Sequence, residues 1–123
     1  TPKFFATQGL KTSVFDENLA TKELAYQFHE LTLLKGSRKA ILSMFSNRKG
    51  DSYNADSLRS ITSPLLAIHG EEDNIIPYSS SLIFEDYLKD VELKIYPKVG
   101  HLPMYEAPKK VSEDIKQFYF ERF

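Results

Sequence analysis

The sequence has no cysteine and no tryptophan, and its 123 residues carry a net charge of only -1 at pH 7. Without cysteine, a disulfide scaffold, a Cys-ligated zinc site and a thiol nucleophile are excluded, and a reducing compartment such as the cytoplasm is favoured. The near-neutral charge gives no reason to expect nucleic acid or an anionic membrane as a partner. No apolar run approaches the roughly 20 residues of a membrane span, so we expect none.

The second half of the chain alternates between strand and helix patterns. Residues 65–68 form a short apolar run after a proline, which is typical of a strand covered on both faces. Residues 91–96 alternate apolar and polar side chains, which predicts a second strand nearer a sheet edge. Residues 79–88 have helical spacing and predict a crossover between two parallel strands. An amphipathic helix is expected from Pro108 onwards, covering the sheet.

The first half shows helical patterns only. Residues 1–20 have little periodicity and are expected to be irregular. Thr21 is expected to cap a helix that Gly36 stops, and Ser37 to cap a second helix that frays at residues 47–50. A polar connection with a short helical turn around residues 57–61 follows. Two strands make a poor sheet, so we expect the chain to be the end of something longer or to share its sheet with another chain.

Two titratable side chains follow the two predicted strands. Asp73 comes three residues after Gly70 at the end of the first strand, and His101 follows the second strand. Because parallel strands end at the same edge of a sheet, these side chains are expected within hydrogen-bond reach. A carboxylate bonded to one imidazole nitrogen supports a proton on the other, which is the acid and base part of a nucleophilic triad.

The residues around this pair carry a family resemblance. The segment PLLAIHGEEDNIIP, residues 64–77, resembles the P-x-L-x-I-x-G-x-x-D-x-x-x-P segment that bears the triad acid of α/β-hydrolase-fold enzymes. The segment GHLPMYEAP, residues 100–108, resembles the G-H-x-P-x-x-E-x-P segment that bears their histidine. The resemblance covers about residues 64–123, and more loosely residues 16–62. It is to cap-bearing esterases, lipases and epoxide hydrolases.

The resemblance implies an α/β fold, namely the carboxyl-terminal part of an α/β-hydrolase with parallel strands, flanking helices and an incomplete sheet. Residues 1–62 are then the end of the cap region and a linker, and residues 63–123 the end of the hydrolase core. The family's nucleophile lies in a G-x-S-x-G turn. None of the five glycines of this chain belongs to such a motif. The chain is therefore expected to hold the acid and the base of a triad but not its nucleophile. The resemblance implies that the missing half supplies a serine or, as in dehalogenases and epoxide hydrolases, an aspartate.

Other polar residues have simpler interpretations. Glu71 and Glu72 are expected to be solvated loop charges, and the serines at 79–81 to cap a helix. His69 is expected to shape the turn, and His29 to be partly exposed and inert. Without metal-ligand spacing among the histidines we expect no metal, and the resemblance implies no cofactor. Glu106 is expected to set up the turn into the last helix or to cap that helix. By the resemblance, Ile75 and Leu102 are expected to line the acyl pocket. The aromatic residues of the last helix are expected to pack in the core and against the helix rather than to form a ligand cage: Phe118, Tyr119, Phe120 and Phe123.

These expectations lead to one hypothesis and two rivals. The leading hypothesis is a hydrolase of esterase or lipase type, acting on a small or medium hydrophobic acyl substrate, in which Asp73 orients His101 and the missing amino-terminal half supplies the nucleophile. The chain alone is then inactive, and its orphaned apolar face favours self-association. The first rival is a non-catalytic ligand-binding protein on the same fold. The second is a complete small α/β interaction module with a fortuitous pair.

Overall fold

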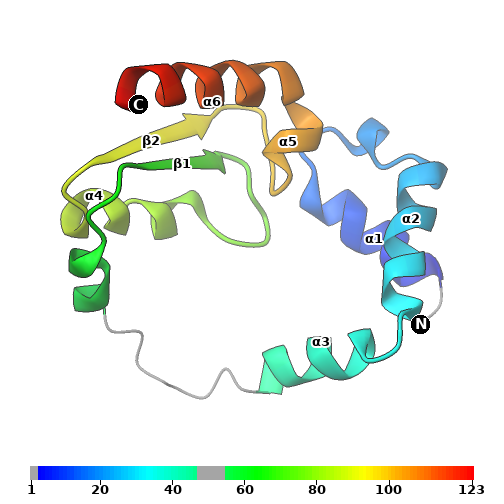
Figure 1. Cartoon of the computed structure of the whole chain (residues 1–123). Helices are drawn as coiled ribbons and strands as arrows, with labels where there is room; N and C mark the ends of the chain where they lie inside the picture. Colours follow the sequence, from blue (N-terminus) through cyan, green and yellow to red (C-terminus); the bar gives the residue numbers. More distant parts are fainter. Residues whose placement is uncertain (1–2, 47–54) are drawn as a thin grey trace.

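The computed structural model describes residues 3–46 and 55–123 (Figure 1). Within these ranges, both strands lie in the second half, and the first half is helical, as expected from the sequence. The elements in chain order are α1 (Lys3–Ser13), η1 (Glu17–Leu19), α2 (Lys22–Leu33), α3 (Ser37–Ser46), η2 (Ala55–Ser60), β1 (Leu65–Gly70), η3 (Tyr78–Ser81), α4 (Ile83–Tyr87), β2 (Val91–Tyr96), α5 (Pro103–Glu106) and α6 (Pro108–Arg122).

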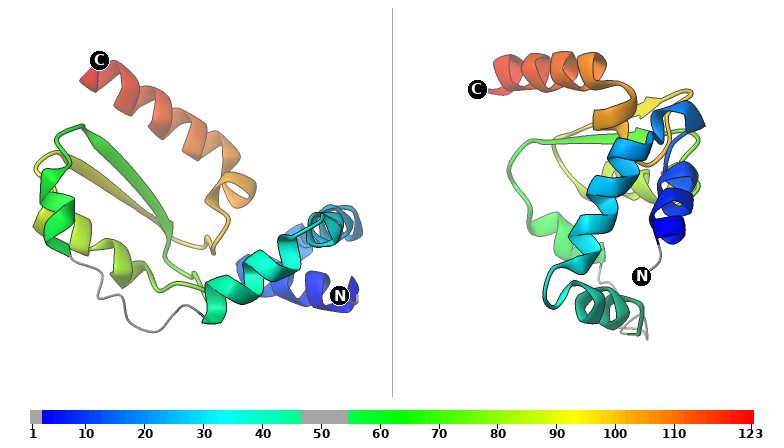
Figure 2. Two further views of the ribbon diagram at one scale, coloured as in Figure 1. Left: turned by 60° about the horizontal axis from the view of Figure 1, so that its bottom comes forward. Right: turned by 90° about the vertical axis from the view of Figure 1, so that its right-hand side faces the viewer.

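The two strands pair in parallel, which confirms the predicted crossover unit. The register runs from Leu65 opposite Val91 to Gly70 opposite Tyr96, so both strands end at the same level. Helices α4 and α6 lie on opposite sides of this two-stranded sheet (Figures 1 and 2). The crossover expected as one helix over residues 79–88 is instead the 3-10 turn η3 followed by the short helix α4. The α/β fold class is therefore the one predicted, with a partial sheet.

Helix α1 corrects the expectation that residues 1–20 are irregular. Residues 3–13, with Gly9 among them, form an 11-residue helix. A helical glycine costs about 1 kcal/mol relative to alanine, which packing offsets readily. Leu10 is 1% exposed, and α1 lies beside α2, where Ala25 is also buried (Figure 1). Tertiary contact, rather than local periodicity, therefore stabilises this helix.

The boundaries of α2 follow the predicted signals. The Thr21 side chain accepts a hydrogen bond from the Leu24 N–H at 3.1 Å, and Gly36 takes a left-handed φ of 92° beyond the end of α2. The cap of α3 differs from the expectation, because the Gly36 carbonyl accepts from the Ala40 N–H and Ser37 is already helical. The predicted fraying at residues 47–50 lies outside the described residues. The 3-10 helix η2 lies close to the helical turn expected at residues 57–61.

Helix α6 is attached to the sheet through a buried tyrosine. Tyr96, at the end of β2, is 1% exposed, and its hydroxyl donates a hydrogen bond to the Asp114 carboxylate of α6. Burial, and then this bond and the negative charge of Asp114, raise the pKa of the Tyr96 hydroxyl well above its usual range. At the other end of the helix, the Arg122 guanidinium lies 3.2 Å from the Asp90 carboxylate beside β2. The covering helix expected from Pro108 is confirmed.

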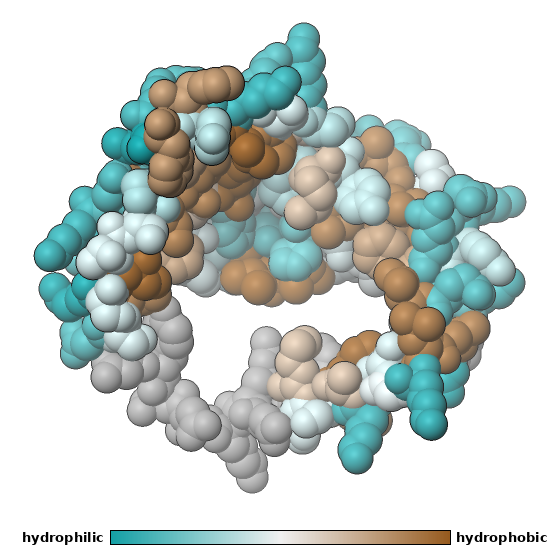
Figure 3. All heavy atoms as spheres, viewed as in Figure 1, coloured by the Kyte–Doolittle hydropathy of each residue, from teal (hydrophilic) through white to brown (hydrophobic). Residues whose placement is uncertain are grey.

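The outer part of α6 is more exposed than a packed helix normally is. The aromatic rings of Tyr119 and Phe123 stack on each other, but they are 58% and 79% exposed, and Phe120 is 80% exposed. Some exposure of these rings was expected if the rest of the hydrolase fold is absent, and Phe118, by contrast, is half-buried. Figure 3 shows apolar surface gathered along α6 and between α2 and α3. These apolar faces have no partner within residues 3–46 and 55–123.

Candidate active site

The loops after β1 and β2 run against each other at the common end of the sheet. The Glu71 N–H donates to the Tyr96 carbonyl at 2.9 Å, and the Glu72 N–H donates to the Val99 carbonyl at 3.0 Å. A Cβ atom on Gly70 would lie 2.0 Å from the Gly100 carbonyl oxygen, far inside van der Waals contact. Glycine at position 70 therefore allows the two loops to approach closely enough for their side chains to meet.

Asp73 lies at the centre of the site. Its Oδ1 accepts hydrogen bonds from the Ile75 N–H at 2.7 Å and the Ile76 N–H at 2.9 Å, and its Oδ2 lies 2.8 Å from His101 Nδ1. The side chain is only 3% exposed. Burial by itself raises the pKa of this carboxyl, but the Ile76 N–H, His101 and the Ile75 N–H outweigh it and lower the pKa overall. Asp73 is thus held as an anion that faces His101.

The ring of His101 is oriented by this carboxylate. Because a carboxylate oxygen only accepts, Nδ1 of His101 carries the proton of the 2.8 Å bond. The second nitrogen, Nε2, makes no hydrogen bond within the described residues. The His101 side chain is 35% exposed and, with Asp73, lines a small cavity of about 120 Å³. An imidazole held in this way is poised to accept a proton at Nε2 from a group entering the cavity.

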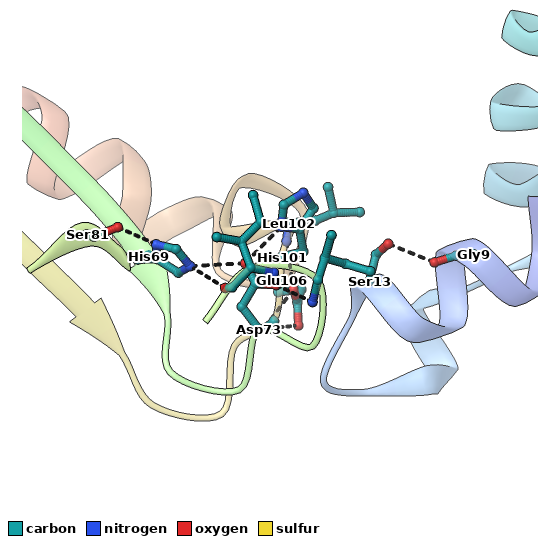
Figure 4. A network of polar contacts seen from close by, with 11 residues as sticks. Gly9, Ser13, His69, Asp73, Ser81, His101, Leu102 and Glu106 are labelled. Carbon is teal, nitrogen blue, oxygen red and sulfur yellow. Dashed lines mark hydrogen bonds and ion pairs between the residues drawn. The ribbon is translucent and has the colours of Figure 1, made fainter. Parts of the chain in front are cut away.

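The backbone around His101 is held by Ser13, which is distant in sequence, and by the nearby Glu106. The His101 N–H donates to the Ser13 carbonyl at 2.7 Å, at the end of α1. The Glu106 carboxylate accepts from the N–H groups of Phe15 at 2.7 Å, Gly100 at 2.9 Å and Leu102 at 3.2 Å (Figure 4). Glu106 was expected to set up the turn into the last helix or to cap that helix. It also joins the start of the chain to the histidine loop, a contact that no local sequence pattern predicts.

His69 forms a second histidine contact with Asp73. Its Nε2 lies 3.1 Å from Asp73 Oδ2 and 2.9 Å from the Ile76 carbonyl oxygen, and its Nδ1 lies 2.5 Å from the Ser81 hydroxyl (Figure 4). This agrees with the expected role in shaping the turn. Ser81 was expected to cap a helix, but its hydroxyl contacts the His69 ring instead, and no side chain caps η3. The sequence therefore predicted the turn but not the network.

Several other residues differ from expectation. Glu71 is exposed, as predicted, but the Glu72 carboxylate accepts from the Val99 N–H at 3.2 Å and so is more than a solvated charge. His29 is 7% exposed rather than partly exposed, and its Nδ1 has no hydrogen-bond partner within the described residues. Neither Ile75 nor Leu102 lines the cavity next to His101. Their assignment to a substrate pocket stays a prediction.

The part of the chain that the structure describes contains neither a cluster of metal ligands nor a helix that could span a membrane. Residues 3–46 and 55–123 contain no group of three or more histidine, aspartate and glutamate side chains arranged to hold a metal ion. Over the same ranges, the helices are too short or too polar to cross a bilayer.

Comparison with known proteins identifies the family. The sequence model of the prolyl oligopeptidase family matches residues 12–123. Among curated proteins, a 2-hydroxymuconate semialdehyde hydrolase from Pseudomonas sp. is 27% identical over 112 residues, covering 87% of this chain and 40% of that protein. A monoacylglycerol lipase from Mycolicibacterium smegmatis is 38% identical over 56 residues, which is 44% of this chain and 20% of the lipase.

Solved structures share the fold at low sequence identity. A meta-cleavage product hydrolase from Pseudomonas fluorescens superimposes with a TM-score of 0.85 at 23% identity, covering 98% of this chain and 46% of that one. An esterase from Exiguobacterium antarcticum gives a TM-score of 0.76 at 21% identity, covering 94% and 42%. The chain thus spans less than half the length of the proteins it matches. By its family match and its fold, it belongs to the prolyl oligopeptidase family of α/β-hydrolases.

Proposed function

We propose that this chain supplies the acid and the histidine of a Ser-His-Asp triad, in a hydrolase that acts on an acyl ester or a related carbonyl substrate. The observation that carries the proposal is the 2.8 Å contact between Asp73 Oδ2 and His101 Nδ1 at the shared end of two parallel strands. The order of acid before histidine matches the chain order of α/β-hydrolase triads. Asp73 and His101 are the proposed catalytic residues.

The proposed chemistry divides between the two side chains. His101 Nε2 removes the proton from a nucleophilic hydroxyl as the oxygen attacks the substrate carbonyl, and later returns it to the leaving group. Asp73 keeps Nδ1 protonated, so that Nε2 is the free base, and stabilises the imidazolium that forms between the two steps. The lowered pKa of Asp73 supports this role, because the carboxylate stays charged while the imidazole takes up and releases its proton.

The nucleophile is proposed to come from a polypeptide segment that carries a G-x-S-x-G turn. No such motif occurs among the 123 residues. A serine is favoured over an aspartate because one solved neighbour, at a TM-score of 0.84, is described as a serine hydrolase involved in carbazole degradation. The partner is then the amino-terminal half of an α/β-hydrolase, whose strands would continue the sheet beside β1. Cytoplasmic localisation and a small hydrophobic substrate complete the proposal.

The assignments of residues 1–62 to a cap region, and of Ile75 and Leu102 to the acyl pocket, are part of the same proposal. The helical first half supports the former, since among the described residues it contributes no strand to the sheet. For the latter, the support is attachment to the proposed pair: the Ile75 N–H donates to Asp73 Oδ1, and Leu102 directly follows His101 in the chain.

Hydrolysis of p-nitrophenyl acetate and p-nitrophenyl butyrate tests the proposal. We expect turnover by a protein that carries residues 1–123 together with a G-x-S-x-G segment, and none by the 123-residue chain alone. His101→Ala and Asp73→Asn should each lower kcat by about 10³ to 10⁴. His29→Ala, on the distant helix α2, serves as the matched histidine control. Binding of the esters without turnover would favour a non-catalytic ligand-binding protein instead.

A further inference from the structure

Asp73 Oδ2 is shared between two imidazoles. His101 Nδ1 lies 2.8 Å from this oxygen and His69 Nε2 lies 3.1 Å from it. The side chain of His69 is 14% exposed, and that of Asp73 is 3% exposed, so water has little access to the second contact. One carboxylate oxygen thus receives hydrogen bonds from a residue of β1 and from the loop after β2, although a triad requires only the bond from His101.

The neighbours of His69 determine which nitrogen carries its proton. Nε2 faces two acceptors, Asp73 Oδ2 and the Ile76 carbonyl oxygen at 2.9 Å, and therefore must be a donor. In the neutral ring Nδ1 is then the acceptor, and it lies 2.5 Å from the hydroxyl of Ser81, which is 8% exposed. The network runs in one direction: Ser81 donates to His69, His69 donates to Asp73, and Asp73 holds His101.

We propose that His69 is a positioning residue for the triad acid, with Ser81 fixing its tautomer. The inference rests on the proposed function of Asp73 and His101. By donating to the same oxygen that faces His101, His69 holds the Asp73 carboxylate against rotation and favours its anionic form. Its second bond, to the Ile76 carbonyl, closes the loop whose Ile75 and Ile76 N–H groups hold the other oxygen. Asp73 can then present Oδ2 to His101 in a single orientation.

A merely structural role for His69 makes a different prediction. If the ring only filled space beneath the loop, an apolar side chain of similar size would replace it without affecting Asp73. If the Nε2 hydrogen bond matters, a side chain that places an N–H at the same point should replace it better. Glutamine does this, since its amide nitrogen lies close to where His69 Nε2 lies. The pair His69→Leu and His69→Gln therefore separates the two roles.

The test is carbon-13 NMR titration of the Asp73 carboxyl in the full chain. We expect His69→Leu to raise the pKa of Asp73, because the anion loses a donor. His69→Gln should keep the Asp73 pKa low, and Ser81→Ala should raise it by less than His69→Leu does. In a protein that also carries the nucleophile, His69→Leu should lower kcat by about threefold to tenfold, and His69→Gln by less than about twofold, as one buried hydrogen bond implies.

The outcomes separate the inference from the proposed function. An unchanged Asp73 titration in folded His69→Leu overturns the role of His69 and leaves the triad intact. Equal shifts in His69→Leu and His69→Gln overturn it too, since the donor then makes no difference. The Asp73→Asn variant tests the pair itself: if the nitrogen-15 resonances of the His101 ring do not respond to it, Asp73 and His101 are not bonded and the proposed function fails. Amide spectra of each variant verify folding.

Discussion

At the scale of single residues, Asp73 concentrates most of the polar contacts of the site. Two backbone N–H groups bind Oδ1 and two imidazoles bind Oδ2, all around a side chain that is 3% exposed. Charge-assisted hydrogen bonds of this kind favour the ionised carboxylate strongly enough to overcome the cost of burial. The same bonds that orient His101 therefore also contribute to the stability of the fold.

These contacts predict that part of the pH dependence of the chain's stability is lost when Asp73 is replaced by asparagine. The pKa of Asp73 in the folded state lies below its ordinary value of 3.8, so its stabilising contribution is fully present above that value and is lost as the pH falls below it. Urea unfolding between about pH 5 and pH 2.5 should show a smaller loss of stability in Asp73→Asn than in the parent chain. At pH 7 the variant should be less stable by about 1 to 3 kcal/mol.

Asp86→Asn is the matched control for this experiment, because Asp86 is an exposed carboxylate on α4. It should leave the pH dependence as it is in the parent chain. If Asp73→Asn behaves like Asp86→Asn, the carboxylate of Asp73 does not contribute to folding in the way that its contacts indicate.

At the scale of elements, the close approach of the β1 and β2 loops depends on glycine. Gly70→Ala would place a methyl group 2.0 Å from the Gly100 carbonyl oxygen and 2.3 Å from the Val99 carbonyl oxygen, both of them backbone atoms that cannot rotate away. We expect this variant to destabilise the chain by about 3 kcal/mol or more and to displace His101. Thermal unfolding measures the first effect and the His101 ring resonances the second.

Gly9→Ala provides the contrast, since nothing lies within 4 Å of a Cβ at that position of α1. It should stabilise the chain by about 0.5 to 1 kcal/mol, as expected for a helical glycine. A stable Gly70→Ala variant with an unmoved histidine would contradict the tight crossing of the two loops.

The elements that could be predicted from sequence are those whose signals are local. Leu65–Ile68 and the alternation from Val91 to Tyr96 predicted two strands, and Gly36 and Pro108 predicted helix boundaries, all of which the structure confirms. Helix α1 was missed because it packs against α2 and buries Leu10, neither of which a local pattern reveals. Helix α1 thus depends on packing against a later helix, α2, rather than on its own sequence pattern.

The candidate site divides in the same way. Asp73 and His101 were predicted because each follows a strand end, and parallel pairing brings such ends together. The Glu106 contacts with Phe15 and Gly100, and the Ser13 contact with His101, join segments up to 91 positions apart. Side-chain bonds over such separations depend on the completed fold, so no spacing rule could supply them. Whether Asp73 and His101 perform triad chemistry stays a prediction.

At the scale of the whole molecule, the described chain exposes more apolar surface than a monomer normally does. Phe120 is 80% exposed, Phe123 79%, and Leu42 and Met44 69% each. Contiguous apolar surface of this kind marks faces that bind other protein. We propose that in a complete hydrolase these faces contact the remaining half of the fold, and that the 123-residue chain alone associates with itself.

Sedimentation velocity tests the self-association. The chain should show a concentration-dependent shift to dimers or larger species, and the double substitution Phe120→Lys with Phe123→Lys should weaken it by about tenfold or more, because two large apolar groups are lost from the contact. Ser112→Lys, at an exposed polar position on the same helix, also adds a positive charge but removes no apolar surface. It should have little effect on the self-association. A monomer at every concentration would contradict the proposal.

We propose that His101, oriented by Asp73, activates a serine that is not among these 123 residues. Labelling with a fluorophosphonate, which reacts with activated serines, followed by peptide mapping tests this most directly. We expect one adduct, on a serine within a G-x-S-x-G segment outside residues 1–123, and its loss in the His101→Ala variant. An adduct on a serine of this chain, or labelling that persists without His101, would overturn the proposed role of His101.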